Sequence, residues 1–213
     1  MNILILDTTT YSPAFAYYID GKQVFCNVIE NERNADSVVT LMKNEFSAHR
    51  ISMNDTGVIS LSNGPGSYTG LRVGSAIAKG ISVACSARLV EISTLDILAA
   101  AVENKEITAV IPSNSRTHEF YYAEYFGNKK QSEYMIDVIE NINKSGKIIV
   151  IDKAERVKLP DGLQVVQVDG KQKIDAQYRL TLEKIRKGEY TDVSKAEPFY
   201  MKDFVPLKSK KKI

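Results

Sequence analysis

The feature that most constrains the fold of this chain is the order of its apolar segments, which is repeated once along the sequence. The first half of the 213 residues predicts three strands, a helix, a strand, a helix, and a further strand and helix. Its second and third strands are joined by Asp20-Gly21, a dipeptide typical of a hairpin turn. The second half repeats the order more loosely. The predicted strands cover residues 2–6, 14–19, 23–29, 58–61, 88–92, 107–111, 119–126, 148–151 and 163–168, with a short one near Tyr134, and the predicted helices cover residues 34–49, 69–86, 93–102, 136–143 and 174–185, the last stopping at Gly188.

Two successive units of this kind indicate an α/β protein with a duplicated actin-like (ASKHA, ribonuclease H-like) fold. In such a fold each of two lobes is a mixed sheet flanked by helices. We place the N-terminal lobe at residues 1–104 and the C-terminal lobe at residues 105–213. The second lobe ends in a basic tail, which is explained either as a solubilising segment or as a nonspecific contact with nucleic-acid phosphate. The tail carries Lys208, Lys210, Lys211 and Lys212.

A glycine-rich stretch follows the predicted strand at residues 58–61. Residues 63–74 read Asn-Gly-Pro-Gly-Ser-Tyr-Thr-Gly-Leu-Arg-Val-Gly, and a strand that enters such a loop before a helix can aim backbone amides at an anion or a partner. The spacing fits neither a dinucleotide fingerprint, nor a P-loop, nor a hydrolase elbow. A tight strand-to-helix turn is the alternative interpretation. The candidate residues for an anion, nucleotide or subunit-junction site are Asp7, Thr8, Gly64, Gly66, Ser67, Thr69 and Arg72.

As a string, residues 63–74 resemble the central motif of the TsaB (YeaZ) family. Residues 1–10 resemble the opening strand and Asp-Thr-Ser/Thr-Thr turn of that family, residues 116–121 the motif that begins its second lobe, and residues 198–202 its Pro-x-Tyr-Leu-Arg ending. TsaB proteins are catalytically degenerate relatives of TsaD in the pathway that forms N6-threonylcarbamoyladenosine in tRNA. The resemblance therefore implies the same actin-like fold and a role in that pathway.

The acidic residues indicate an incomplete catalytic site. Actin-like phosphotransferases bring one carboxylate from each lobe to a metal-bound nucleotide, and Asp7, at the end of the first strand, is placed to supply one of them. The corresponding turn of the second lobe offers Asn114, whose amide is a much weaker ligand for a hard cation. Asp7 is also explained as a cap of local amides at a strand end. We expect no catalytic residue, and keep as the alternative function a nucleotide-dependent phosphotransferase or hydrolase that uses Asp7 and the 63–74 loop.

Histidine and cysteine offer no metal site in this sequence. His49, His118, Cys26 and Cys85 have no ligand spacing, whereas TsaD-like enzymes carry a metal-binding pair of histidines one helical turn apart. The first helix of TsaB relatives commonly holds a His-Ser pair, where this chain has Asp36-Ser37. We therefore expect no bound metal and no tightly bound cofactor. ATP or ADP stays a candidate ligand at the junction with a partner.

Small residues recur every four positions along the helix after the glycine loop, at Gly70, Gly74, Ala78 and Ser82. Such a row lets a second element approach closely. The pattern alone fits tight packing inside the lobe, and the resemblance implies docking instead, because TsaB relatives pair through the first two helices of this lobe with TsaD or with themselves. The predicted partner interface consists of Val38, Met42, Gly70, Gly74 and Ala78.

Bulk properties exclude several classes of protein. The net charge of +2 is too small to indicate nucleic-acid binding by itself. Isolated cysteines fit a reducing compartment, and no apolar segment reaches the length of a membrane span. We expect a soluble cytoplasmic protein.

The resemblance implies a non-catalytic scaffold or activating subunit. Its partner is expected to be a TsaD-type threonylcarbamoyltransferase that modifies position 37 of tRNAs reading ANN codons, with a TsaE-type ATPase in the same complex. The chain is expected to meet tRNA only indirectly, and to form a homodimer when alone.

Overall fold

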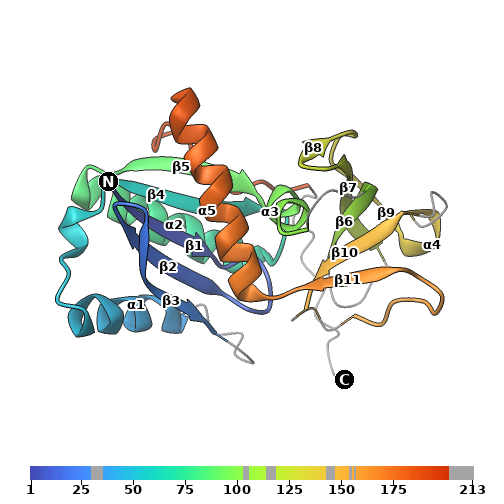
Figure 1. Cartoon of the computed structure of the whole chain (residues 1–213), viewed down its shortest axis with the longest axis horizontal. Coiled ribbons are helices and arrows are strands. Elements are labelled where there is room, and N and C mark those ends of the chain that lie inside the picture. Colours follow the sequence, from blue (N-terminus) through green and yellow to red (C-terminus); the bar gives the residue numbers. More distant parts are fainter. Residues whose placement is uncertain are drawn as a thin grey trace, which may run out of the picture.

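The computed structural model describes residues 1–29, 36–102, 106–113, 119–142, 147–153, 155 and 157–201, without the side chain of Asp36. These residues form two lobes, each built on its own sheet (Figure 1). Asn114, Arg116, His118 and the lysine tail lie outside the described residues, so the expectations placed on them stay predictions. The described residues include no helix with both the length and the hydropathy needed to cross a membrane.

The sheet of the first lobe has, among the described residues, the strand order β3-β2-β1-β4-β5. The pairs β1–β2 and β2–β3 are antiparallel, whereas β1–β4 and β4–β5 are parallel, which gives the expected mixed sheet. The strands are β1 (Asn2–Asp7), β2 (Ala14–Ile19), β3 (Lys22–Val28), β4 (Val58–Gly64) and β5 (Arg88–Ser93).

Alternation along β1 explains why helices cover both faces of this sheet. Leu4 and Leu6 point to one face, where they share a core with α1 (Asp36–Ala48) and α2 (Tyr68–Cys85). Ile3 and Ile5 point to the other face, where they pack with α3 (Thr94–Ala100) and α5 (Gly170–Lys187). Successive side chains of a strand face opposite ways, so a nearly all-apolar strand requires cover on both sides.

The sheet of the second lobe has, within the described residues, the order β11-β10-β6-β7-β8, and β9 pairs with β7. One face packs against Leu95 and Leu98 of α3, and the other against Ile139 and Ile142 of α4. Since α3 also packs on the first sheet, it lies between the two lobes. The elements are β6 (Glu106–Pro112), β7 (Glu119–Phe126), β8 (Lys129–Lys130), β9 (Met135–Val138), α4 (Ile139–Ile142), β10 (Ile148–Asp152) and β11 (Val165–Val168).

The predicted helix at residues 136–143 is corrected by the structure. Its first residues belong to β9, where Ile136 pairs with Tyr121 and Val138 with Glu119 of β7. Of the predicted residues that the structure describes, 136–142, only those of the short α4 are helical. The segment forms a strand because pairing with β7 satisfies its backbone N–H and C=O groups. The sequence alone does not show that this edge of β7 is available.

Helix α5 follows the last strand of the second sheet but packs on the sheet of the first lobe (Figure 1). It begins at a capping box, in which Asp169 and Gln172 each satisfy the other's backbone N–H. It ends at Gly188, whose φ of +71° suits a glycine C-cap. The return of α5 brings side chains near its start to the junction between the lobes.

Gly66, Gly70 and Gly74 are required by a close approach to the turn after β1. A Cβ added at Gly70 would lie 1.9 Å from the carbonyl oxygen of Thr8, and one added at Gly74 would lie 2.2 Å from Thr8 Oγ1. Gly80, on the same helix, has nothing within 4 Å of such a Cβ. The space beside Gly70 and Gly74 is therefore occupied by the turn after β1 of the same lobe.

We predict opposite effects of alanine at two glycines of α2. Gly70→Ala should lower the free energy of unfolding by about 2 kcal/mol or more, because its Cβ meets backbone atoms that cannot swing away. Gly80→Ala should raise it by up to about 1 kcal/mol, since alanine is the better helix former and the space is open. Urea unfolding of both variants measures the difference, and equal effects would contradict this account of the packing.

Candidate functional site at the lobe junction

Asp7 ends β1 and is fully buried. Its Oδ1 accepts hydrogen bonds from the backbone N–H of Thr9 (2.9 Å) and from Thr9 Oγ1 (2.6 Å). Asp7 thus caps the amides of its own turn, one of the two roles that the sequence left open. Its second oxygen, Oδ2, accepts a hydrogen bond from Lys173 Nζ of α5.

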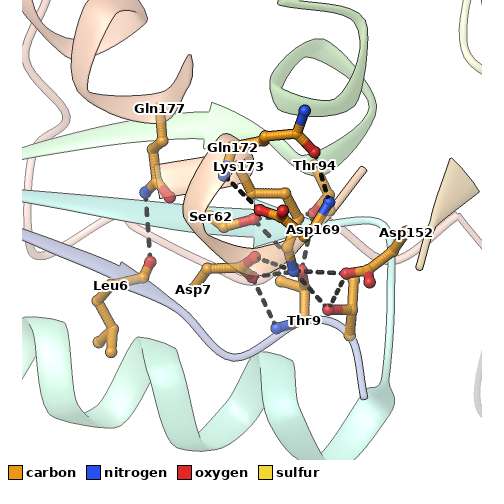
Figure 2. A network of polar contacts seen from close by, with 11 residues as sticks. Leu6, Asp7, Thr9, Ser62, Thr94, Asp152, Asp169, Gln172, Lys173 and Gln177 are labelled. Atoms are coloured by element: carbon orange, nitrogen blue, oxygen red, sulfur yellow. Dashed lines mark hydrogen bonds and ion pairs between the residues drawn. The ribbon is translucent and has the colours of Figure 1, made fainter. Parts of the chain in front are cut away.

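Lys173 of α5 joins this carboxylate to a second one. Its Nζ lies 2.8 Å from Asp7 Oδ2 and 2.6 Å from Asp152 Oδ2, and all three side chains are fully buried. Figure 2 shows the ammonium between the two carboxylates. Asp152 is the last residue of β10, an interior strand of the second sheet, so each lobe contributes one carboxylate at the end of an interior strand. Thr10 Oγ1 accepts a hydrogen bond from Lys173 Nζ (2.6 Å) and donates one to Asp152 Oδ2 (2.6 Å).

The charges in this cluster stabilise one another. Burial alone would raise the pKa of Asp7, but Lys173 and the hydrogen bonds from Thr9 bring it below its usual value. Burial alone would lower the pKa of Lys173, but Asp7 and Asp152 raise it above its usual value. The ammonium is therefore charged throughout the physiological range of pH.

Glu155 adds a further carboxyl group next to this cluster. Burial, followed by repulsion from Asp152, raises the pKa of Glu155 to about 7, and the effects of Lys173 and of the backbone N–H of Tyr11 only partly oppose this. The cluster already holds two carboxylates for one ammonium. Another negative charge here is therefore unfavourable, and Glu155 is partly protonated at neutral pH.

A second polar bridge joins the lobes through Asp96 of α3. Tyr125 Oη donates to Asp96 Oδ1 (2.7 Å) and Tyr134 Oη to Asp96 Oδ2 (2.8 Å). Burial, together with the charge of Asp96, raises the pKa of both tyrosines, so they remain donors. The orientation of the lobes is thus held at two separate points.

The predicted loop residues gather around the turn that follows β1. Thr8 Oγ1 donates to the carbonyl oxygen of Gly70 (2.7 Å), and the backbone N–H of Ser67 donates to that of Thr9 (2.7 Å). Ser67 also caps α2 through Gly70 N–H. At this end of the loop, the amide and hydroxyl groups bind the turn and the helix of the same lobe.

The remaining candidates of the loop differ in exposure. An added Cβ at Gly66 would lie 2.4 Å from the carbonyl oxygen of Thr9 in the same lobe, whereas one at Gly64 would lie 2.8 Å from the carbonyl oxygen of Phe199 near the C-terminal end of the described chain. Thr69 and Arg72 are exposed. The guanidinium of Arg72 lies 4.1 Å from the centre of the Tyr68 ring, and its Nε donates to Tyr200 Oη (3.2 Å).

The residues predicted for a partner interface are buried inside the first lobe. Val38, Met42 and Ala78 belong to the core beneath α1 and α2, with at most 1% of each exposed. Gly70 and Gly74 face the turn after β1. These five residues therefore pack within the lobe, and any partner that docks on α1 and α2 must contact their other faces. A bulky side chain in place of Ala78 would therefore disturb the packing of the core and would not test whether a partner docks on α2.

Two residues of the junction, Asp152 and Lys173, were not predicted from the sequence. Asp152 had a usable signal, because it directly follows the apolar run at residues 148–151 in the way that Asp7 follows its strand. Lys173 begins a polar row with Gln177 and Thr181, spaced four apart on one face of α5 and all fully buried. Gln177 and Thr181 bind Ser60 of β4. When the position of α5 is not known, a row of polar residues like this one predicts a helix face exposed to solvent.

The two lobes, each a mixed sheet flanked by helices, define a duplicated actin-like protein. A family model described as "TsaD: tRNA N6-adenosine threonylcarbamoyltransferase" matches residues 30–194. Because this match covers most of the sequence, the chain belongs to the TsaD family, and the relatives described next place it with the TsaB (YeaZ) proteins, as its motifs predicted.

Curated relatives carry the name tRNA threonylcarbamoyladenosine biosynthesis protein TsaB. The protein of Buchnera aphidicola subsp. Schizaphis graminum is 27% identical over 180 residues, which cover 78% of this chain and 85% of that protein. The protein of Haemophilus influenzae is 25% identical over 136 residues, 63% of this chain and 58% of its own length. The aligned part thus spans little more than half of the Haemophilus protein.

Solved structures support the fold. YeaZ from Pseudomonas aeruginosa superimposes with a TM-score of 0.74 at 18% identity, covering 94% of this chain and 99% of that chain. A second structure, described as an uncharacterized protein with similarity to peptidase YEAZ from the same organism, gives a TM-score of 0.73 at 17% identity with the same coverage. At this identity the likeness concerns the fold alone.

We predict that Glu155 makes stability depend on pH. A carboxyl group whose pKa is about 7 when folded and near 4.5 when unfolded binds its proton more tightly in the folded state. Its contribution is present below about pH 4.5 and is lost as the pH rises through 7. Relative to the parent, Glu155→Gln should be nearly neutral at low pH and stabilising at pH 8, on the order of 2 kcal/mol.

Urea unfolding of both proteins across this range measures the effect. Glu183→Gln, at an exposed position of α5, is the control and should follow the parent. A difference between Glu155→Gln and the parent that does not change with pH would contradict the assignment.

Proposed function

We propose that this chain is a non-catalytic subunit that binds a TsaD-type transferase and supports formation of N6-threonylcarbamoyladenosine in tRNA. Membership of the TsaD family and the names of its TsaB relatives support the pathway. The modification of position 37 in tRNAs that read ANN codons, with a TsaE-type ATPase in the same assembly, belongs to the same proposal. The chemistry would then be carried out by the partner.

The observation that carries the non-catalytic part is the position of Lys173. In an actin-like enzyme, carboxylates from the two lobes hold the metal of a nucleotide. Here Asp7 and Asp152 supply such a pair, but an ammonium lies 2.8 Å and 2.6 Å from their oxygens. A carboxylate that neutralises a buried lysine has little capacity left for a cation. A nucleotide of the complex would more readily bind at the junction with the partner, near the exposed Thr69 and Arg72.

The surface proposed for docking is the outer face of α1 and α2. It consists of Val39 on α1, 54% exposed, and of Ala76, Gly80, Val83 and Ala84 on α2, where Val83 is 75% exposed. Both helices cover the same face of the first sheet. The small side chains at 76, 80 and 84 leave room for a helix of the partner to approach closely. The same face would serve a homodimer in the absence of that partner.

We predict that Val83→Arg weakens binding of a purified TsaD-type partner at least tenfold. Burying a valine contributes roughly 1.5–3 kcal/mol, and a factor of ten needs about 1.4 kcal/mol. Phe126→Arg is the matched control, because Phe126 is 65% exposed but lies on the second lobe. Calorimetric titration and tRNA modification by the reconstituted complex measure both variants. Unimpaired binding by a folded Val83→Arg protein would exclude this face.

The alternative function, a nucleotide-dependent phosphotransferase or hydrolase, makes a different prediction. It requires that Asp7 and Asp152 bind a metal–nucleotide complex despite Lys173. We expect the isolated chain not to turn over ATP above the rate of a protein-free control, because the ammonium of Lys173 already pairs with both carboxylates. Turnover by the parent that is lost in Asp7→Asn would replace the scaffold proposal with the enzyme.

A further inference from the structure

Three oxygen atoms from both lobes converge on one buried ammonium. Lys173 Nζ lies 2.8 Å from Asp7 Oδ2, 2.6 Å from Thr10 Oγ1 and 2.6 Å from Asp152 Oδ2. An ammonium has three hydrogens, so each of its donors has a partner. Asp7 and Thr10 belong to the first lobe, Asp152 to the second, and Lys173 to the helix that crosses between them.

The donor set is that of a hard cation. Two carboxylates and one hydroxyl provide oxygen ligands only, which suit Ca²⁺ or Mg²⁺. The distances to Nζ exceed the 2.3–2.6 Å of Ca²⁺ coordination by a few tenths of an ångström at most.

We propose that Asp7, Thr10 and Asp152 form a cation site shared by the two lobes, and that the ammonium of Lys173 is its built-in occupant. In the natural chain the lysine keeps divalent cations out and joins the lobes without any bound ion. Without the lysine side chain, the same oxygens would take Ca²⁺ or Mg²⁺. This inference concerns the isolated chain and is independent of the proposed partner.

The competing explanation is that Lys173, Asp7 and Asp152 form only a structural ion pair, whose oxygens would not bind a metal ion. In that case, truncation of Lys173 leaves two buried carboxylates and a cavity, and the variant is merely destabilised. In that case, lowering the pH would restore the stability of the variant by protonating the two carboxylates. The two explanations differ in whether a divalent cation restores what the ammonium provided.

The test is Lys173→Ala, measured by thermal unfolding and by calorimetric titration with Ca²⁺ and with Mg²⁺. Binding of one ion at about 100 times its Kd should raise Tm by about 5–10 °C, while NaCl of equal ionic strength should not. The parent should show no specific rise. If Lys173→Ala is unfolded without cations, its far-UV circular dichroism should recover when Ca²⁺ is added.

Two control variants keep the result specific. Lys173→Gln fills the space with a neutral amide and should be destabilised without responding to divalent cations. The double variant Lys173→Ala with Asp152→Asn should lose the response. No specific cation effect on the Tm, heat of binding or folding of Lys173→Ala would overturn the proposal, as would an equal response of Lys173→Gln.

Discussion

The structure depends on one buried charge. Lys173 is fully buried, and an unpaired ammonium in such a place would be very costly. Its ion pairs with Asp7 and Asp152 offset this cost only while both lobes and α5 keep their positions. Removal of one partner from a buried pair typically destabilises by about 3–5 kcal/mol. The relative position of the lobes is therefore coupled to the stability of each.

The path of the chain follows from the same contact. Helix α5 leaves the second sheet at β11 and packs on Ile3, Ile5 and Val90 of the first sheet. Its polar row of Lys173, Gln177 and Thr181 points inward and finds partners at Asp7 and Ser60. All three side chains of the row therefore have polar partners in the first lobe, where α5 packs. The crossing of α5 to the first lobe thus explains how its polar row can be buried, and the polar contacts of the row in turn hold the helix there.

The sequence was sufficient for most of the elements, though not for β9, and for half of the junction. Apolar runs and the hairpin dipeptide at Asp20-Gly21 predicted the strands well, because those signals are local. Asp7 was also identified, since it ends a buried strand. Lys173 was not, because its burial is decided by the crossing of α5, which is a tertiary feature. The row from Gly70 to Ala78 predicted a close approach, but periodicity does not say whether the approaching element belongs to the same lobe or to a partner.

The glycine-rich motif and the ion pair form one system. Gly70 and Gly74 let α2 lie directly against the turn after β1, and Thr8 Oγ1 and Ser67 N–H tie that turn to the helix. The turn carries Thr10, whose hydroxyl touches Lys173. A motif that could aim amides at an external anion thus positions an internal ion pair. Because the described residues occupy its inner face in this way, a protein that docks on α2 would contact its outer face.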